Sequence, residues 1–425
     1  MTSDDATGES ADDEARPPAA ATEEPAAAVL VREPRSAVAG PITDADQLAD
    51  VASRLGAATG PVAVDAERAS GYRYSQRAYL IQLWREGVGV VLIDPIPLAD
   101  LSPLQHAIGS AEWVLHAASQ DLACLREVGL EPEHLFDTET AGRLLGMERV
   151  SLSSMLETFL GVSLEKGHSA ADWSTRPLPA DWLVYAALDV DLLIELRDAV
   201  AAELDRTGKR DWSEQEFAAT LAAPPPQPRA EPWRRTSGIH KLRSRRQLAI
   251  VRSLWQTRDD TASARDIAPG RILPDSAIVA AARANPETIT ELSTLPVFRG
   301  PRQRRQANRW FNAVEQARAL AEAELPTATA RGEAIPAPSR WRERDPAAAA
   351  RLVAARTVVS QLAETHHVQP QNLLPADIVR RLCWQPPPDL DGPAVAAALT
   401  RLGARPWQVD LCAAPIAAAF SAVAA

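Results

Sequence analysis

Short apolar runs near the start of the chain have the length and spacing of β-strands. PVAVDAE (61–67), AYLIQLW (78–84) and GVGVVLID (87–94) are separated by polar or glycine-containing turns, which predicts an antiparallel meander. WVLHAAS (113–119) and HLFDTET (134–140) are each followed by a helical pattern. Strand-then-helix units of this kind predict an α/β domain with a mixed sheet.

Helical spacing dominates the rest of the chain. Residues 180–204, ADWLVYAALDVDLLIELRDAVAAEL, place apolar side chains every three or four positions and predict one long helix. Two stretches, AAPPPQPRAEPWRRTSG and PTATARGEAIPAPS, have no hydrophobic period and are typical of linkers. The chain is thus divided into a tail, an α/β domain, a linker, a helical domain, a second linker and a second helical domain: 1–40, 41–221, 222–238, 239–325, 326–339 and 340–425.

Charge and composition differ strongly between these parts. The first thirty residues hold 8 acids and 1 Arg among many Ala and Pro, which predicts a disordered acidic tail. No apolar run has membrane-spanning length and no signal-peptide pattern is present, so we expect a cytoplasmic protein without membrane association. Three widely spaced cysteines also fit a reducing compartment. The net charge is −11, yet residues 229–318 carry 18 Lys or Arg against 8 Asp or Glu, a balance suited to a phosphate backbone.

Five residues of the α/β domain are candidates for catalytic chemistry. Asp65 and Glu67 stand at i and i+2 of a predicted strand, so their carboxylates leave the same face. Tyr185 and Asp189 share a helix face at i and i+4, and Asp121 begins another predicted helix. Taken singly, they are explained as a surface acidic pair, a helix cap and a core tyrosine. Together they supply the converging carboxylates that two divalent cations, Mg²⁺ or Mn²⁺, require for phosphodiester hydrolysis.

Three motifs carry a resemblance to a known family. VDAERASGYRYSQRAYLIQL, HAASQDLACL with FDTETAGRLLG, and DWSTRPLPADWLVYAALDVDLL resemble the exonuclease motifs of ribonuclease D, a DEDD-type 3′→5′ exonuclease, over about 60–205. The histidine subgroup has His five residues before the last Asp, where this chain has Val184. Tyr185, four residues before Asp189, resembles the tyrosine subgroup instead. The resemblance implies a ribonuclease H-like α/β fold, a mixed sheet flanked by helices.

The same resemblance implies an activity and a role for each motif residue. Asp65, Glu67, Asp121 and Asp189 would bind two Mg²⁺ or Mn²⁺ ions, and Tyr185 would orient the attacking water. The implied enzyme is a metal-dependent 3′→5′ exoribonuclease that releases nucleoside 5′-monophosphates. Its implied partner is RNA with a single-stranded 3′ end, with tRNA precursors as the expected case.

Two positions depart from the family pattern where the terminal nucleotide is held. An aromatic residue often follows the first-motif Glu, but here Arg68 does. A stacking contact with the terminal base is therefore either missing or supplied by Tyr72 or Tyr74. Asn often follows the second-motif His, but here His116 is followed by Ala117.

The helical domains extend the resemblance. The first is similar to the HRDC domain, a small all-α nucleic-acid-binding module found in ribonuclease D and RecQ-type helicases. An Arg-rich helix face is often only solvated surface, but beside an exonuclease we expect phosphate contacts from the basic residues of this domain: Lys241, Arg245, Arg302, Arg304, Arg305 and Arg309. NLLPADIVRRLCW (372–384) echoes RILPDSAIVAAAR (271–283), so the last block is interpreted as a second HRDC-like domain. Its nearly balanced charge favours packing against the catalytic domain or shaping a channel over strong phosphate binding.

Two other functional classes stay open from the sequence. A 3′→5′ DNA exonuclease would use the same five residues, because metal ions and phosphate do not report the sugar. A non-catalytic nucleic-acid-binding protein on an exonuclease scaffold would be expected to have lost a carboxylate, and all four are present.

Overall fold

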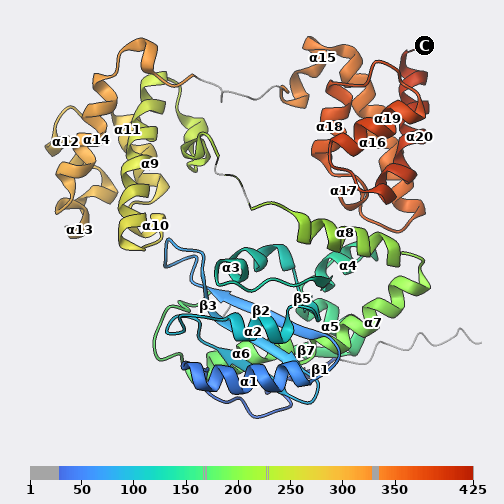
Figure 1. Ribbon diagram of the computed structural model, residues 1–425. Helices are drawn as coiled ribbons and strands as arrows, with labels where there is room; N and C mark the ends of the chain where they lie inside the picture. Colours follow the sequence, from blue (N-terminus) through green and yellow to red (C-terminus); the bar gives the residue numbers. More distant parts are fainter. Residues whose placement is uncertain are drawn as a thin grey trace, which may run out of the picture.

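The protein consists of an α/β domain and two helical domains. The computed structural model describes residues 28–165, 167, 170–225, 227, 229–327 and 335–424. In Figure 1 the helical domains lie apart from each other, beside different parts of the α/β domain. Within the described residues, no helix combines the length and apolarity that a membrane span requires.

The elements of the α/β domain follow the order expected from the sequence. The strands are β1 Val29–Val31, β2 Val62–Arg68, β3 Ala78–Arg85, β4 Gly89–Ile93, β5 Glu112–Leu115, β6 His134–Asp137 and β7 Val162–Leu164. The helices are α1 Ala45–Ala57, α2 Ser102–Ile108, α3 Leu122–Glu127, α4 Thr138–Leu144, α5 Leu152–Leu160, α6 Ala180–Asp191, α7 Leu193–Arg206 and α8 Arg210–Ala222.

The main sheet is mixed, and its central strand is β2. The strand order is β4-β3-β2-β5-β6. The predicted meander is confirmed, because β2, β3 and β4 pair antiparallel. β2, β5 and β6 run parallel, as the strand-then-helix units predict. A strand covered on both sides must be apolar, and Val62, Ala63 and Val64 are almost fully buried. This burial fixes the register that carries Asp65 and Glu67.

The predicted long helix at 180–204 is two helices. α6 ends at Asp191 and α7 begins at Leu193, with Leu192 between them at φ −112° and ψ 8°. Because α6 packs against β2, β3 and β4 while α7 packs against β2, β5 and other helices, a single straight helix would not contact both surfaces. The apolar spacing continues through the break, so the sequence pattern alone predicts no interruption there.

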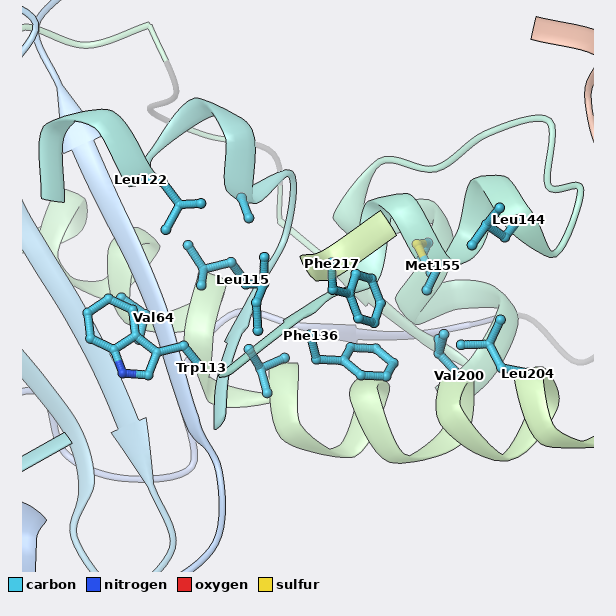
Figure 2. Packing of buried hydrophobic residues seen from close by; sticks show 14 of the residues in the cluster. Val64, Trp113, Leu115, Leu122, Phe136, Leu144, Met155, Val200, Leu204 and Phe217 are labelled. Atoms are coloured by element: carbon cyan, nitrogen blue, oxygen red, sulfur yellow. The ribbon is translucent and has the colours of Figure 1, made fainter. Parts of the chain in front are cut away.

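Helices pack against the sheet to form the core of the α/β domain, and one part of this core lies at β5 and β6. Figure 2 shows Val64, Trp113 and Leu115 of the sheet packed beside Phe136 and Phe217. The rings of Phe136 and Phe217 have centroids 5.0 Å apart, which joins α8 to β6. The Trp113 indole N–H is also satisfied, because it donates to the Ile108 carbonyl at 2.9 Å.

The two helical domains repeat the same order of elements. The first contains α9 Arg245–Arg265, α10 Pro269–Ile272, α11 Asp275–Ala284, α12 Ile289–Thr294, α13 Pro301–Arg304 and α14 Ala307–Ala319. The second contains α15 Trp341–Arg344, α16 Pro346–Thr365, α17 Pro370–Leu373, α18 Ala376–Trp384, α19 Gly392–Arg401 and α20 Pro406–Ala424. In each, a helix of about twenty residues precedes a four-residue helix beginning with Pro and then a helix of nine or ten. The echo in the sequence therefore corresponds to a structural repeat.

The cores of these two domains differ in one respect. Buried residues of the first domain form a cluster of their own, including Trp310 and Leu254. Those of the second, including Trp407 and Phe420, belong to one cluster with the core of the α/β domain. The prediction that the last block packs against the catalytic domain is confirmed.

Three predicted boundaries need correction. Residues 29–31 form β1, which pairs in parallel with β7, so the assignment of a disordered tail up to residue 40 is wrong from residue 28 onward; residues 1–27 lie outside the described residues. The linker at 222–238 is also too long, because a 3₁₀ turn at 232–235 places Trp233 in the core of the first helical domain. Similarly, the Trp341 indole N–H donates to the Pro336 carbonyl at 2.8 Å, so the second helical domain begins before residue 340.

Candidate metal centre

Three of the four predicted metal ligands meet beside the central strand. Asp65 and Glu67 lie on β2 and Asp189 lies on α6, 124 positions after Asp65 in the chain. One carboxylate oxygen from each lies within 4.8 Å of the other two. Oxygen ligands at this spacing are those that Mg²⁺ and Mn²⁺ prefer. The packing of α6 across β2 therefore creates the site, since neither element alone carries enough carboxylates.

The electrostatics of these carboxylates favour a bound cation. Burial raises the pKa of Asp65 to about 6. Burial, together with the charges of Asp65, Asp189 and Asp121, raises the pKa of Glu67 to about 10. Burial also holds the pKa of Asp189 well above its ordinary range, and the charge of Asp65 adds to that shift. Ionising several buried acids side by side is unfavourable unless a cation neutralises them. The residues present therefore fit a divalent metal centre.

Asp121 lies beside this cluster but faces a different partner. It occupies the N-cap position of α3 as predicted, yet its side chain makes no capping hydrogen bond. Arg68 Nη2 lies 3.2 Å from Asp121 Oδ1, and the two side chains are 27% and 8% exposed. Burial, followed by the charge of Asp65, raises the pKa of Asp121 to about 8, while the Arg68 guanidinium opposes that shift. Asp121 is thus paired with an arginine, which the sequence reasoning did not foresee.

Tyr185 is placed one helical turn before Asp189, as the spacing predicts. Its hydroxyl donates a hydrogen bond to the Asp189 carboxylate. Burial raises the pKa of Tyr185, and the charge of Asp189 raises it further, so the hydroxyl is protonated at neutral pH. The Tyr185 ring packs against Gly167 so closely that a Cβ at residue 167 would lie 2.9 Å from a ring carbon. Tyr185 lines a cleft of about 850 Å³ between α6 and residues 32–38.

The segment before the predicted domain also supports this helix. The backbone N–H and the Nε of Arg35 donate to the Asp191 carboxylate at 3.0 and 3.2 Å, and the guanidinium also contacts Glu195 and the Asp191 carbonyl. Asp191 is the last residue of α6, two positions after Asp189. Arg35 therefore stabilises the end of the helix that carries Tyr185 and Asp189. The apolar run Val-Leu-Val at 29–31 was the feature of the sequence that indicated ordered structure in this segment.

Tyr72 and Tyr74, the two candidates for stacking on the terminal base, both contact the first helical domain. The Arg271 guanidinium lies over the Tyr72 ring at 4.0 Å from its centroid. The Tyr74 hydroxyl donates to Asp259 at 3.2 Å, and its ring packs against the core of that domain. Arg271 therefore covers one face of the Tyr72 ring, and the Tyr74 ring is held against the first helical domain. The loop after β2 instead serves as the docking point for the first helical domain.

Ala117 adopts a backbone conformation that suits the asparagine of the family pattern. It lies at φ 63° and ψ 49°, in the left-handed region, where Asn and Gly are favoured over Ala. Its N–H donates to Asp137 Oδ1 at 3.0 Å, and the Ala118 N–H donates to Asp137 Oδ2 at 3.1 Å. Asp137 therefore holds this turn through two backbone N–H groups.

The basic residues expected to contact nucleic acid lie on the surface of the first helical domain. Six are exposed: Lys241, Arg245, Arg302, Arg304, Arg305 and Arg309. Arg245 donates to the carbonyls of Glu322, Leu325 and Pro326, so it also ties the two ends of the domain together. Arg309 donates to Thr261 Oγ1 at 3.2 Å.

Models of known families match all three structured parts of the chain. Residues 40–205 match the family described as 3′-5′ exonuclease, and residues 247–314 match the HRDC domain. Residues 334–420 match a family described as 3′ to 5′ exonuclease C-terminal domain. The last match assigns the second helical domain to exonucleases by a model distinct from that of the HRDC domain.

Curated relatives and solved structures agree with these matches. Ribonuclease D of Acidiphilium cryptum is 30% identical over 362 residues, 82% of this chain and 87% of that protein. Ribonuclease D of Jannaschia sp. is 33% identical over 298 residues, 67% of this chain and 76% of that protein. Among solved structures, a protein from Bifidobacterium adolescentis superposes with a TM-score of 0.86 at 38% identity, covering 93% of this chain and all of that one. Escherichia coli RNase D, an exoribonuclease, gives a TM-score of 0.64 at 27% identity, covering 85% and 97%.

Fold, site geometry and relatives lead to the same assignment. The divalent-metal dependence of this kind of exonuclease accords with the carboxylate cluster on β2 and α6. An exonuclease domain followed by an HRDC domain accords with a nucleic-acid substrate. The chain belongs to the ribonuclease D family and is a 3′→5′ exoribonuclease.

Proposed function

We propose that Asp65, Glu67, Asp121 and Asp189 hold two divalent cations, Mg²⁺ or Mn²⁺, and that Tyr185 orients the attacking water. The observation that carries the proposal is the set of three carboxylate oxygens within 4.8 Å of one another, with Asp121 directly beside them. When bound, the two cations would activate a water and neutralise charge on the departing 3′ oxygen. The protein itself then has to supply ligands, orientation and a path for RNA.

The Tyr185 hydroxyl is suited to orientation rather than proton abstraction. Its raised pKa keeps the proton on oxygen, and the hydrogen bond to Asp189 directs that oxygen toward the carboxylate cluster. A protonated phenol beside the cluster accepts a hydrogen bond from water, which aligns the water for in-line attack. Tyr185→Phe is therefore expected to lower kcat by about 10²-fold while Mn²⁺ affinity changes little.

Digestion of end-labelled RNA tests this assignment directly. Wild-type protein with Mg²⁺ should shorten a 5′-labelled RNA one nucleotide at a time from the 3′ end. Asp65→Asn should lower the rate by more than about 10²-fold, whereas Asp198→Asn, an acid on α7 that is 62% exposed, should not change it. No metal-dependent shortening by the wild-type protein would overturn the assignment.

Preference for RNA and for tRNA precursors is the finer part of the proposal. A DNA strand of the same sequence in the same assay measures the first preference, and equal rates on both strands would contradict it. A tRNA precursor with a short 3′ extension, compared with an unstructured RNA of equal length, measures the second preference.

The cytoplasm is the proposed compartment of the protein. The free, buried cysteines Cys124, Cys383 and Cys412 support it, because a reducing compartment keeps thiols free.

The exposed arginines of the first helical domain are proposed to hold RNA through its phosphates. Arg302, Arg304 and Arg305 are exposed and close together in sequence on and just after α13. Replacing all three with Gln should weaken RNA binding and reduce its salt dependence, because each phosphate contact contributes to the salt slope. Replacing Arg252, which is half-buried, together with the exposed Arg283 and Arg299 of the same domain is the control for lost charge alone.

A further inference from the structure

Arg68 stands where an aromatic side chain is common in the family, and the structure gives it a specific position. It ends β2, directly after Glu67, and the pairing of β2 with β3 shifts register between these two residues. At this shift Arg68 contacts Asp121, with Nη2 3.2 Å from Asp121 Oδ1. Arg68 Nε is buried without a hydrogen-bond partner. The guanidinium is therefore held by one carboxylate and has further donors to offer.

This ion pair accounts for the different position of Asp121 among the four acids. Oxygens of Asp65, Glu67 and Asp189 converge within 4.8 Å, while Asp121 is not part of that group. The Arg68 guanidinium already offsets part of the charge of Asp121 and places a positive charge beside the position where a cation would bind. Arg68 and a metal ion thus compete for the negative charge of Asp121.

A pocket beside the site gives Arg68 a second place to act. It has a volume of about 210 Å³ and is lined by Glu67, Arg68, Ser70 and Gly71 of the strand end, with Ala170 and Ala171 opposite. This is smaller than the roughly 300–1,000 Å³ of ordinary ligand pockets, and suits a single sugar or phosphate group. Glu67 on the wall would repel an anion, so a phosphate there needs the neighbouring guanidinium.

Charge balance points in the same direction. Two divalent cations just neutralise four carboxylates, which leaves the Arg68 guanidinium as an unmatched positive charge beside the site. A phosphodiester carries one negative charge, and arginine binds phosphate oxygens through two parallel N–H donors. The charge that opposes metal binding in the free protein is therefore suited to substrate binding in the metal-loaded protein.

We propose that Arg68 is an internal counter-ion that competes with metal for Asp121 and, once displaced, binds a phosphate of the RNA in the adjoining pocket. The inference rests on the metal centre proposed above. It makes Arg68 a residue with opposite effects on two ligands: it weakens metal binding and strengthens RNA binding.

Metal titration without RNA tests the first half. Mn²⁺ binding to the full chain is measured by calorimetry for the wild type, Arg68→Gln and Arg68→Lys. Arg68→Gln should bind Mn²⁺ about tenfold more tightly, because the competing charge is gone, and Arg68→Lys should stay near the wild type. Arg126→Gln is the matched control, since Arg126 is 24% exposed, lies on α3 and pairs with Glu131 at 2.7 Å; its Mn²⁺ affinity should equal that of the wild type.

Steady-state kinetics at saturating Mn²⁺ test the second half. Arg68→Gln should raise KM for single-stranded RNA about tenfold and change kcat by less than about threefold, while Arg68→Lys should raise KM less. If the role of Arg68 were only structural, Arg68→Gln would lower the thermal midpoint of unfolding and leave the Mn²⁺ affinity unchanged or weaker. That result would overturn the inference.

The outcomes separate this inference from the proposal beneath it. Failure of the wild type to bind Mn²⁺ would overturn the metal centre itself. If the wild type binds Mn²⁺ and Arg68→Gln binds it equally well or more weakly, only the role proposed for Arg68 is overturned. If Arg68→Gln does not fold, Arg68→Lys decides, because a KM equal to that of the wild type would refute the need for a bidentate guanidinium at the phosphate.

Discussion

The two helical domains share an order of elements but are joined to the α/β domain by different forces. The second domain stacks Trp407 on Trp212 of α8, with ring centroids 4.6 Å apart, and its core is continuous with that of the α/β domain. The first domain has a separate core and is joined to the loop after β2 by the ring of Tyr74 and by polar contacts. The Asp266 carboxylate accepts from the N–H groups of Tyr74 and Ser75 at 3.1 and 2.8 Å.

The difference concerns both stability and motion. Burial of large aromatic rings makes two domains unfold together, since separating them exposes apolar area to water. Hydrogen bonds to a surface loop exchange readily with water and contribute about 1 kcal/mol each. We therefore expect one cooperative unit made of the α/β domain and the second helical domain, and a second, weakly attached unit that is able to adjust to RNA.

Truncating one buried tryptophan in each helical domain gives the largest expected effect. Trp407 and Trp310 are 2% and 0% exposed, and either change to Ala should cost about 3–5 kcal/mol. Trp407→Ala should lower the thermal transition of the catalytic unit and its residual activity after heating, whereas Trp310→Ala should lower only the transition of the first helical domain. Calorimetry combined with activity after heating measures both. A loss of catalytic stability in Trp310→Ala would show that the two units are not separate.

Metal binding should act on only one of these units, and its effect should grow with pH. In the metal-free protein the raised pKa values of Asp65, about 6, and Glu67, about 10, mean that the folded state holds protons more tightly than the unfolded state. Stability from these groups is present near pH 4 and is lost as pH rises through 6 to 10. A fixed Mg²⁺ concentration, set a hundredfold above the Kd at pH 6, should add about 2.7 kcal/mol at pH 6. The gain should be larger at pH 9, where the Kd is lower because fewer protons have to leave the carboxylates.

Calorimetry at the two pH values, with and without Mg²⁺, measures this gain. The transition of the first helical domain serves as the internal control, because it contains none of the carboxylates concerned. A Mg²⁺-dependent shift of that transition, or a gain that is larger at pH 6, would contradict the expectation.

Loosening the polar attachment of the first helical domain should have a smaller, local effect. Asp266 lies in the left-handed region at φ 45°, so Asp266→Gly removes the carboxylate without backbone strain. The docking free energy should fall by about 1–3 kcal/mol, which hydrogen exchange of residues 71–77 reports as faster exchange. Asn285→Gly is the matched control, since Asn285 is a left-handed helix cap at φ 46° in the same domain. Equal exchange in both variants would argue that other contacts hold the loop.

Relief of backbone strain next to the active site should give the smallest effect. Ala117 is buried in the left-handed region, and Ala117→Gly should stabilise the catalytic unit by about 0.5 kcal/mol, the balance of strain relief and glycine entropy. Ala118→Gly, the next residue of the same turn, should instead destabilise it. A shift of both variants in the same direction in thermal unfolding would show that strain at residue 117 is not the cause.

Some features were determined by local sequence. Strand and helix types follow from apolar period, and the i and i+2 spacing of Asp65 and Glu67 and the i and i+4 spacing of Tyr185 and Asp189 follow from fixed element geometry. These regularities need only neighbouring residues, so the motifs, the mixed sheet and the repeated helical order were predicted correctly.

Tertiary structure decided the remaining features, because they depend on contacts between distant segments. The break at Leu192 arises because α6 and α7 pack on different surfaces. The order of residues 29–38 depends on pairing with β7 and on Asp191. The Arg68 pair with Asp121 joins positions 53 apart in the chain. No local pattern encodes such partners, since each side chain alone is equally compatible with solvent.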